Sequence, residues 1–590
     1  MTRWTMKLDG ADLPDKALIG GKGWSVARMA SLGLTVPPAF VITTKACAAY
    51  QDGKTFPDGL QAEIAEGISW LEEETGRTYG AGPSPLLVSV RSGAAISMPG
   101  MMDTVLNMGI TPVTETALAT ECDDPGFARD THRRFHELYA HIVLKTDAGN
   151  LSNDDTAEDW AAAIRGASGS ELPADPVERL HAAVRAVFES WDSRRAKRYR
   201  KHHGIPDDLG TAVVVQAMVF GNMGSTSGTG VMFSRNPVDG DPAPYGEFLA
   251  NAQGEDVVSG KFTPRPLDTM KDVLPDAHAQ LLKAARRLEI ENGDVQDIEF
   301  TVQDGTLYLL QSRAAKRAPE AALKIACDML DEGAIDEVTA LSRITPDQVR
   351  SLLAPRLPER ATETAEVLAR GEAASPGIGI GLVVTDSDDA ERSANNGAAV
   401  ILARETTSPD DLHGMIAAMA VITERGGSTS HAAVVSRALG VPCVTGCGDG
   451  SVTALKGQTV TVDGANGLIL KGALPVQEPD ETALAGLVKL TRIAERMSPV
   501  KVILPENAPS NALDLNRIDG GSEIQRLPDL LKGAQIAGGG ALSDDKGIAI
   551  AVQAGVTAIV GRPRLPILLA AIRAGAVTED RETVAVSATD

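Results

Sequence analysis

The sequence predicts a multidomain protein of mixed α/β and α+β class. The chain has 590 residues, which is enough for about four average domains. Short runs rich in β-branched residues alternate with helical periodicity along most of it. A segment rich in proline and charge, from Ala354 to about Ser375, separates a long amino-terminal part from a shorter carboxyl-terminal part.

The composition excludes several classes of partner. The chain carries 56 basic and 79 acidic residues, and its net charge of −23 argues against general affinity for nucleic acid or an anionic membrane. No window holds the apolar run of about 20 residues that a membrane span needs, and the first residues do not resemble a signal peptide. The five cysteines form no disulfide framework. We therefore expect a cytoplasmic protein that binds neither nucleic acid nor membrane.

The first element is a glycine-rich turn, Gly20-Gly21-Lys22-Gly23, that leads into an amphipathic helix. Such a turn exposes backbone amides, and Lys22 adds a positive charge, so the two together suit a phosphate group. The turn lacks the spacing of a Walker loop. A surface lysine is the alternative interpretation.

The next element is a buried-strand pattern from Leu86 to Gly93 with Arg91 near its end, followed by the loop from Ser97 to Thr104. A loop of small residues can fold its amides over a triphosphate, and an arginine at a strand end can hold it by paired hydrogen bonds. A structural salt bridge is the alternative role for Arg91.

Helical, charged residues over 175–200 lead to strand patterns over 211–222 and 245–258, with a glycine and hydroxyl hairpin over 224–237 between them. The histidines between 132 and 141 also lie in charged helical patterns. Surface placement is the default interpretation for these histidines.

The strand pattern over 296–301 carries two carboxylates. Alternation places Asp297 and Glu299 on one face and turns Ile298 into the core. Two carboxylates on one face repel each other unless a cation lies between them, and Mg²⁺ that also bridges phosphate oxygens is the economical solution.

The partner strand over 306–313 follows a turn at Asp304-Gly305 and places Gln311 and Arg313 on one face. A Gln–Arg pair opposite an Asp–Glu pair makes a compact site for a polyphosphate and a metal ion. A solvated hairpin face is the alternative.

Residues 314–350 read as helices, and the linker that follows could span up to roughly 80 Å when extended, which suits a mobile domain. Between 376 and about 470, short strands such as 397–402 and 420–423 alternate with helical pieces. After 476, a few βα units remain, with Arg562 and Arg564 as candidate anion contacts.

His431 lies in the most distinctive segment of the chain. Two glycines and three small hydroxyl residues precede it, and the apolar run after it predicts a helix that Gly440 and Pro442 end. The helix N-terminus favours a neutral, nucleophilic imidazole, and the unpaired amides there can receive a phosphoryl group. A helix cap followed by an unrelated histidine is the alternative.

Taken together, these motifs resemble the pyruvate phosphate dikinase family, among the PEP-utilising enzymes. The resemblance covers residues 10 to 470 or so, and its motifs are Leu18–Thr44, Ser89–Gly93, Met98–Thr104, Gln296–Thr301, Leu310–Arg313 and Thr423–Arg437. It implies an ATP-grasp-like nucleotide-binding domain at 1–345, a helical or flexible linker at 346–375, a swivelling phosphohistidine domain at 376–475 and a small α/β domain of unknown role at 476–590.

The resemblance also implies an ATP-dependent dikinase or phosphotransferase with His431 as the catalytic nucleophile. Asp297 and Glu299 would bind Mg²⁺, and Thr429 matches a regulatory phosphorylation site of some members. The residues expected to contact the nucleotide are Lys22, Arg91, Gly100, Thr104, Glu299, Gln311 and Arg313.

The resemblance fails after residue 470 or so, where dikinases continue into a TIM barrel of about 250 residues. The acceptor therefore stays open between pyruvate, with a barrel on a partner chain, and another small molecule that the tail recognises. A non-catalytic regulatory paralogue is a third alternative. The sequence also leaves open whether phosphate or water takes the terminal phosphoryl group and whether the chain forms a homodimer.

Overall fold

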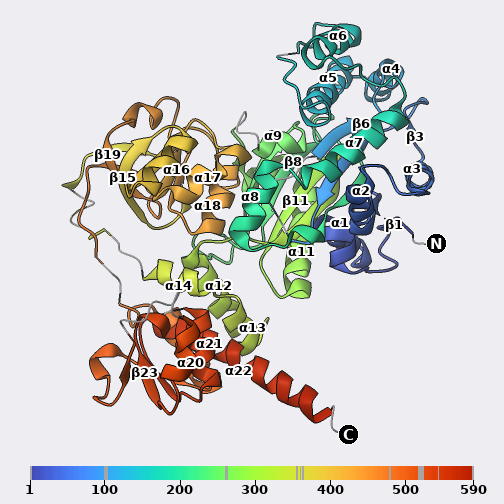
Figure 1. The fold of residues 1–590 in the computed structure, drawn as a ribbon. Helices are drawn as coiled ribbons and strands as arrows, with labels where there is room; N and C mark the ends of the chain where they lie inside the picture. The colour runs from blue at the N-terminus through green and yellow to red at the C-terminus, as the bar shows by residue number, and fades with distance from the viewer. Residues whose placement is uncertain are drawn as a thin grey trace.

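The computed structural model describes residues 3–96, 98, 104–149, 151–258, 263–353, 357–358, 361, 364–477, 480–515, 524–542 and 544–587. These residues form an amino-terminal half built on two antiparallel sheets, a mixed-sheet domain (residues 364–477) and a carboxyl-terminal unit (Figure 1). This architecture confirms the mixed α/β and α+β class that the sequence predicts.

The first sheet of the amino-terminal half has five antiparallel strands. In spatial order they are β1 (Thr5–Lys7), β2 (Ala39–Ile42), β7 (Ala212–Ala217), β5 (Val88–Gly93) and β6 (Thr104–Met108). On one face, Ile19 and Val26 of α1 (Lys16–Ser31) pack against Val41 and Val214. The helices that share a core with the other face are α2 (Thr44–Gly53), α3 (Leu60–Thr75), α5 (Pro125–Ile142) and α7 (Pro176–Ser190).

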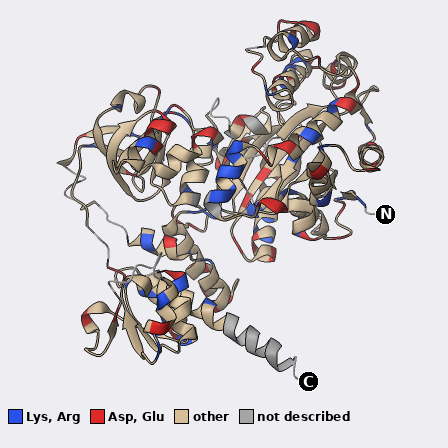
Figure 2. Cartoon of the chain, in the orientation of Figure 1, with Lys and Arg blue, Asp and Glu red and all other residues tan. Residues whose placement is uncertain are grey.

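The elements around this sheet include β3 (Thr78–Tyr79), β4 (Pro85–Leu86), α4 (Pro112–Cys122), α6 (Ala157–Ser168) and α8 (Arg194–His203). His132 and His136 of α5 are only 1% and 2% exposed, so their predicted surface placement is wrong. The sequence pattern could not show that Trp160 of α6 packs against both rings and that Glu115 of α4 lies 2.5 Å from His132 Nδ1. Basic side chains gather on α8 (Figure 2).

The second sheet is also antiparallel. Its strands are β10 (Arg265–Pro266), β9 (Tyr245–Ala250), β8 (Gly228–Phe233), β11 (Gln296–Gln303) and β12 (Thr306–Ala314). Asp304 and Gly305 have φ values of 45° and 76°, as the predicted two-residue turn between β11 and β12 requires. The polar run after β9, which we expected to continue the strand, instead forms α9 (Gly254–Val258). Outside the sheet lie α10 (Met270–Val273) and α11 (Pro275–Asn292).

The mixed-sheet domain is built on eight strands. In spatial order they are β13 (Val367–Arg370), β20 (Leu468–Lys471), β19 (Thr459–Asp463), β15 (Ile378–Val384), β16 (Val400–Arg404), β17 (Ala420–Thr423), β18 (Cys443–Thr445) and β14 (Glu372–Ser375). The central strands β15 to β18 run parallel. The helices between them cover one face of the sheet: α16 (Ser387–Asn395), α17 (Leu412–Ala417) and α18 (His431–Leu439).

The carboxyl-terminal unit has a parallel sheet of four strands. They are β21 (Lys501–Ile503), β24 (Ala558–Val560), β23 (Ile536–Gly538) and β22 (Leu513–Asp514). The helices of the unit are α12 (Pro319–Asp331), α13 (Glu337–Ser342), α14 (Pro346–Leu352), α19 (Ala485–Met497), α20 (Leu527–Leu530), α21 (Asp545–Gln553) and α22 (Arg564–Ser587). Within the part of the chain that the structure describes, no helix is long and apolar enough to cross a bilayer.

The helix α14 falls in the range 346–375 that we assign to the linker. Its Val349 and Leu352 lie in one hydrophobic core with Leu487 and Leu490 of α19. The beginning of this range is therefore a helix packed on the carboxyl-terminal unit, because residues far away in sequence supply its apolar partners.

We predict that Leu490→Ala destabilises the carboxyl-terminal unit by about 2–5 kcal/mol, because the side chain is fully buried in this shared core. Leu530→Ala, at a position 36% exposed, serves as the control and should cost less. Calorimetry of the full chain would resolve the transition of this unit. Equal shifts for the two variants would contradict the packing.

Candidate active site

A cavity of about 730 Å³ lies between the two sheets of the amino-terminal half, and residues of α18 and its preceding loop close part of it. The expected nucleotide contacts that line it are Lys22, Arg91, Thr104, Glu299, Gln311 and Arg313. Thr429 and His431 line it from the mixed-sheet domain. The expected contact Gly100 lies outside the described residues. One chamber therefore brings together side chains that are up to 409 positions apart, from Lys22 to His431.

Arg91 connects the two sheets across this cavity. It extends from β5, and its Nη2 donates to Glu299 Oε2 at 3.0 Å and to Gln311 Oε1 at 3.3 Å. Its Nη1 donates to Gln216 Oε1 of β7 at 3.2 Å. Burial alone would raise the pKa of Glu299, but the positive charges of Arg91, Arg313 and Lys22 outweigh it and lower that pKa. Glu299 is therefore an ionised carboxylate among cations.

Lys22 reaches the cavity because α1 lies very close to β5. Gly20 has φ 70°, and a Cβ there would lie 1.8 Å from the carbonyl oxygen of Gly93, so only glycine permits this approach. Burial, together with the charge of Arg91, lowers the pKa of Lys22 to about 7, although the charge of Glu299 opposes this shift. The side-chain amine in this position takes up a proton most readily when an anion enters the cavity.

Asp297 and Glu299 lie on the same face of β11, opposite Arg313 and Gln311 of β12 in regular register. Ile298 between them is buried in the core. Arg313 Nε donates to Asp297 Oδ2 at 2.8 Å, whereas Asp297 Oδ1 is buried without a hydrogen-bond partner in the described structure. Asp297 itself does not line the cavity, but its unpaired oxygen and the Glu299 carboxylate are the ligand type that a hard divalent cation takes.

His431 is the first residue of α18, as the sequence predicts, and Ser430 is the N-cap. The Thr407 hydroxyl lies 3.1 Å from Nδ1, which orients the ring, while Nε2 is buried and has no hydrogen-bond partner among the described residues. Burial lowers the pKa of His431 to about 4, although the charge of Asp411 opposes this shift. The imidazole is therefore neutral at physiological pH, with a free nitrogen lone pair or N–H beside a cationic cavity.

A set of polar contacts holds the mixed-sheet domain against β9. The Tyr245 hydroxyl donates to Glu372 Oε1 at 2.6 Å and lies 2.7 Å from the Ser428 hydroxyl. Thr429 donates to Glu247, whose pKa is raised, first by burial and then by the nearby charge of Glu372. Sequence reasoning did not single out Tyr245, Glu247 or Glu372. These residues do not belong to a recognisable sequence motif, because they contact one another only where the two domains meet.

Comparisons with known proteins support the two-domain composition of the site. Residues 52–274 match the AMP/ATP-binding domain of pyruvate phosphate dikinase, and residues 397–467 match the mobile domain of PEP-utilising enzymes.

Full-length relatives agree with these matches. The chain is 41% identical over 551 residues to pyruvate, phosphate dikinase of Clostridium symbiosum. The matched region covers 87% of this chain and 63% of that protein. It is 43% identical over 534 residues to pyruvate, phosphate dikinase 2 of Zea mays, covering 84% of this chain and 60% of the relative. For the pyruvate, phosphate dikinase of Rhizobium meliloti the identity is 42%, over 82% of this chain and 59% of the relative. The chain thus spans about three fifths of the length of these relatives.

We predict that a polyphosphate binds with uptake of nearly one proton at pH 8. Lys22, with a pKa of about 7, is mostly neutral at that pH, and an anion raises its pKa and so protonates it. Affinity should fall as the pH rises above 7, because charging Lys22 then becomes harder. Titration calorimetry with inorganic tripolyphosphate, in two buffers of different ionisation enthalpy, measures the uptake.

Lys22→Met should abolish the proton uptake, and Lys45→Met, at an exposed position on α2, should retain it. An unchanged uptake in Lys22→Met would assign the titration to another group.

We further predict that Tyr245→Phe loosens the contact between the mixed-sheet domain and β9. The variant loses both contacts of the hydroxyl, each worth about 1 kcal/mol. Spin labels on β9 and α16 would report the distance distribution between the domains, and it should broaden. Tyr308→Phe, on β12, is the matched control and should leave the distribution unchanged. Identical distributions in both variants would show that this hydroxyl does not hold the domains together.

Proposed function

Because the chain belongs to the pyruvate phosphate dikinase family, we propose that it is an ATP-dependent phosphotransferase that works through a phosphohistidine at His431. The observation that carries the proposal is that His431, from one domain, lines the same cavity as Lys22, Arg91 and Arg313 of another. A neutral imidazole at a cluster of cations is the arrangement that attack on a polyphosphate requires.

The triphosphate of ATP would lie between the two sheets. Arg91, Arg313 and Lys22 neutralise its charge, Gln311 donates a hydrogen bond, and Thr104 contacts the phosphates. These groups stabilise the negative charge on the phosphoryl oxygens and on the leaving oxygen as the bond to AMP breaks.

His431 attacks the β-phosphorus, a nitrogen–phosphorus bond forms, and AMP leaves with the electron pair of the broken oxygen–phosphorus bond. Thr407, 3.1 Å from Nδ1, fixes the orientation of the ring and leaves Nε2 as the nitrogen available for the attack. The pyrophosphohistidine then gives its terminal phosphoryl group to phosphate, or to water in the alternative branch. The phosphohistidine that remains passes its group to an acceptor.

Asp297 and Glu299 fit a Mg²⁺ ion, since Asp297 Oδ1 is a buried oxygen without a partner in the described structure. When bound, Mg²⁺ supplies charge neutralisation between the phosphate oxygens of ATP. The mutual repulsion of the two carboxylates would then decrease.

For the acceptor we favour pyruvate, because the relatives of this chain are named for pyruvate. A barrel on a partner chain would supply the pyruvate site. A homodimer is compatible with this scheme. We place the activity in the cytoplasm, because the described cysteines are all free and the chain is strongly acidic.

A second candidate acceptor is a different small molecule bound by the carboxyl-terminal unit. A cavity of about 710 Å³ there is lined by residues that follow β21, β23 and β24, among them Gly539, Gly561 and Arg562. Ligands of parallel sheets commonly bind at the carboxyl ends of the strands. This cavity is the observation that favours the second candidate over a purely structural tail.

We expect the purified chain, given Mg²⁺ and ATP labelled in the β-phosphate, to release AMP and to retain acid-labile label on His431. His431→Asn should lower AMP formation by about a thousandfold or more, because the nucleophile is lost. His141→Asn, at an exposed position on α5, is the matched control. Normal AMP formation by His431→Asn would refute the proposal and revive the regulatory alternative.

The labelled protein also distinguishes the two acceptors. We expect discharge to pyruvate only after a dikinase barrel chain is added, since that chain would supply the pyruvate site. Discharge to another metabolite by the purified chain alone, with loss of discharge in Arg562→Gln, would instead support the cavity of the carboxyl-terminal unit.

A further inference from the structure

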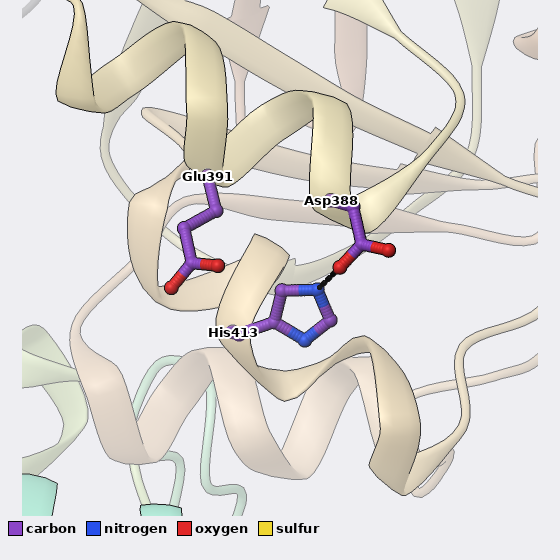
Figure 3. Close-up of side chains that lie close together, drawn as sticks. All are labelled: Asp388, Glu391 and His413. Carbon is purple, nitrogen blue, oxygen red and sulfur yellow. Dashed lines mark hydrogen bonds and ion pairs between the residues drawn. The ribbon is translucent and has the colours of Figure 1, made fainter.

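A cluster of potential metal ligands lies on the mixed-sheet domain, apart from the active-site cavity. Asp388 and Glu391 project from α16, one helical turn apart, toward His413 on α17 (Figure 3). One donor atom of each residue lies within 4.8 Å of those of the other two, and His413 Nε2 lies 2.9 Å from Asp388 Oδ1. None of the three residues lines either large cavity.

The backbone fixes the separation of the two helices that carry these ligands. Gly414, next to His413, lies so close to α16 that a Cβ there would be 2.7 Å from Ser387 Cα. The Ser387 hydroxyl donates to Asp411 Oδ1 at 2.7 Å, which ties the start of α16 to the residue before α17. The ligands are therefore held close together without a metal ion, so that binding an ion requires little ordering of the backbone.

The charge of the cluster is not balanced by a basic side chain nearby. Among the described ion pairs of α16, Arg392 pairs with Asp389 and Asp388 pairs with His413, whereas Glu391 has no cationic partner among the described residues. Two carboxylates and an imidazole in this position supply negative charge and a nitrogen donor at the surface.

We propose that Asp388, Glu391 and His413 form a site for a divalent transition-metal ion of the Zn²⁺ type. One nitrogen and two carboxylate oxygens make a borderline ligand set that suits Zn²⁺, whereas Mg²⁺ prefers oxygen ligands alone. Water completes the coordination, since Asp388 is exposed and the other two residues are partly so. The site is thus chemically distinct from the carboxylate pair of the ATP cavity.

A metal ion in this site would join α16 to α17 and stiffen the segment between β16 and α17. That segment contains Thr407, which contacts His431 Nδ1, and Asp411, whose charge acts on the same ring. The ion would therefore stabilise the segment that orients the His431 ring, without contacting His431.

Zinc binding to the full chain tests the proposal. The protein is freed of metal with a chelator and titrated with Zn²⁺ by calorimetry, in excess Mg²⁺ so that Asp297 and Glu299 are occupied. We expect one Zn²⁺ site in the wild type and an affinity at least about tenfold lower in His413→Gln. His141→Gln, an exposed histidine outside the cluster, should bind like the wild type.

Glu391→Gln provides a second variant that should leave the fold intact, because the partly exposed side chain of Glu391 makes no hydrogen bond to the described residues. It should also bind Zn²⁺ more weakly, and the thermal stabilisation that Zn²⁺ gives the wild type should disappear. With Co²⁺ as a visible probe, the absorption bands of a protein-bound ion should be lost in both variants. Absence of a Zn²⁺ site in the wild type, or equal affinity in His413→Gln, would overturn the proposal.

Discussion

The guanidinium of Arg91 makes the two sheets of the amino-terminal half into one chamber. It extends from the first sheet and reaches Glu299 and Gln311 of the second, so an ion pair and a hydrogen bond join the two walls of the cavity. Such a connection is strong when the cavity is dry and can exchange partners when an anion enters. The charge of Arg91 also contributes to the lowered pKa of Lys22 and to the lowered pKa of Glu299.

The protonation states of the chamber follow from the same arrangement. Burial lowers the pKa of both Lys22 and His431, but the consequences for the two side chains differ. The lysine titrates near physiological pH and can take a charge when one is needed, whereas the imidazole stays neutral and keeps a lone pair.

Local patterns in the sequence predicted the elements that carry the site. Neighbours in the chain determine the glycine turn before Lys22, the strand that carries Arg91 near its end, the β11–β12 hairpin and the helix that begins at His431. Features set by distant partners were missed. The buried state of His132 depends on Glu115 and Trp160, and the contacts of Tyr245 with the mixed-sheet domain depend on a segment 127 residues away. Composition and periodicity contain no record of such pairings.

The path of the chain limits how the mixed-sheet domain can travel. The chain enters this domain after α14 and returns to α19, and both helices are anchored in one core. Two connections that leave from one core restrict the movement of a domain more than a single connection of the same length would. His431 would then serve only sites that both connections allow it to reach, so the shorter connection would set the limit for the whole domain.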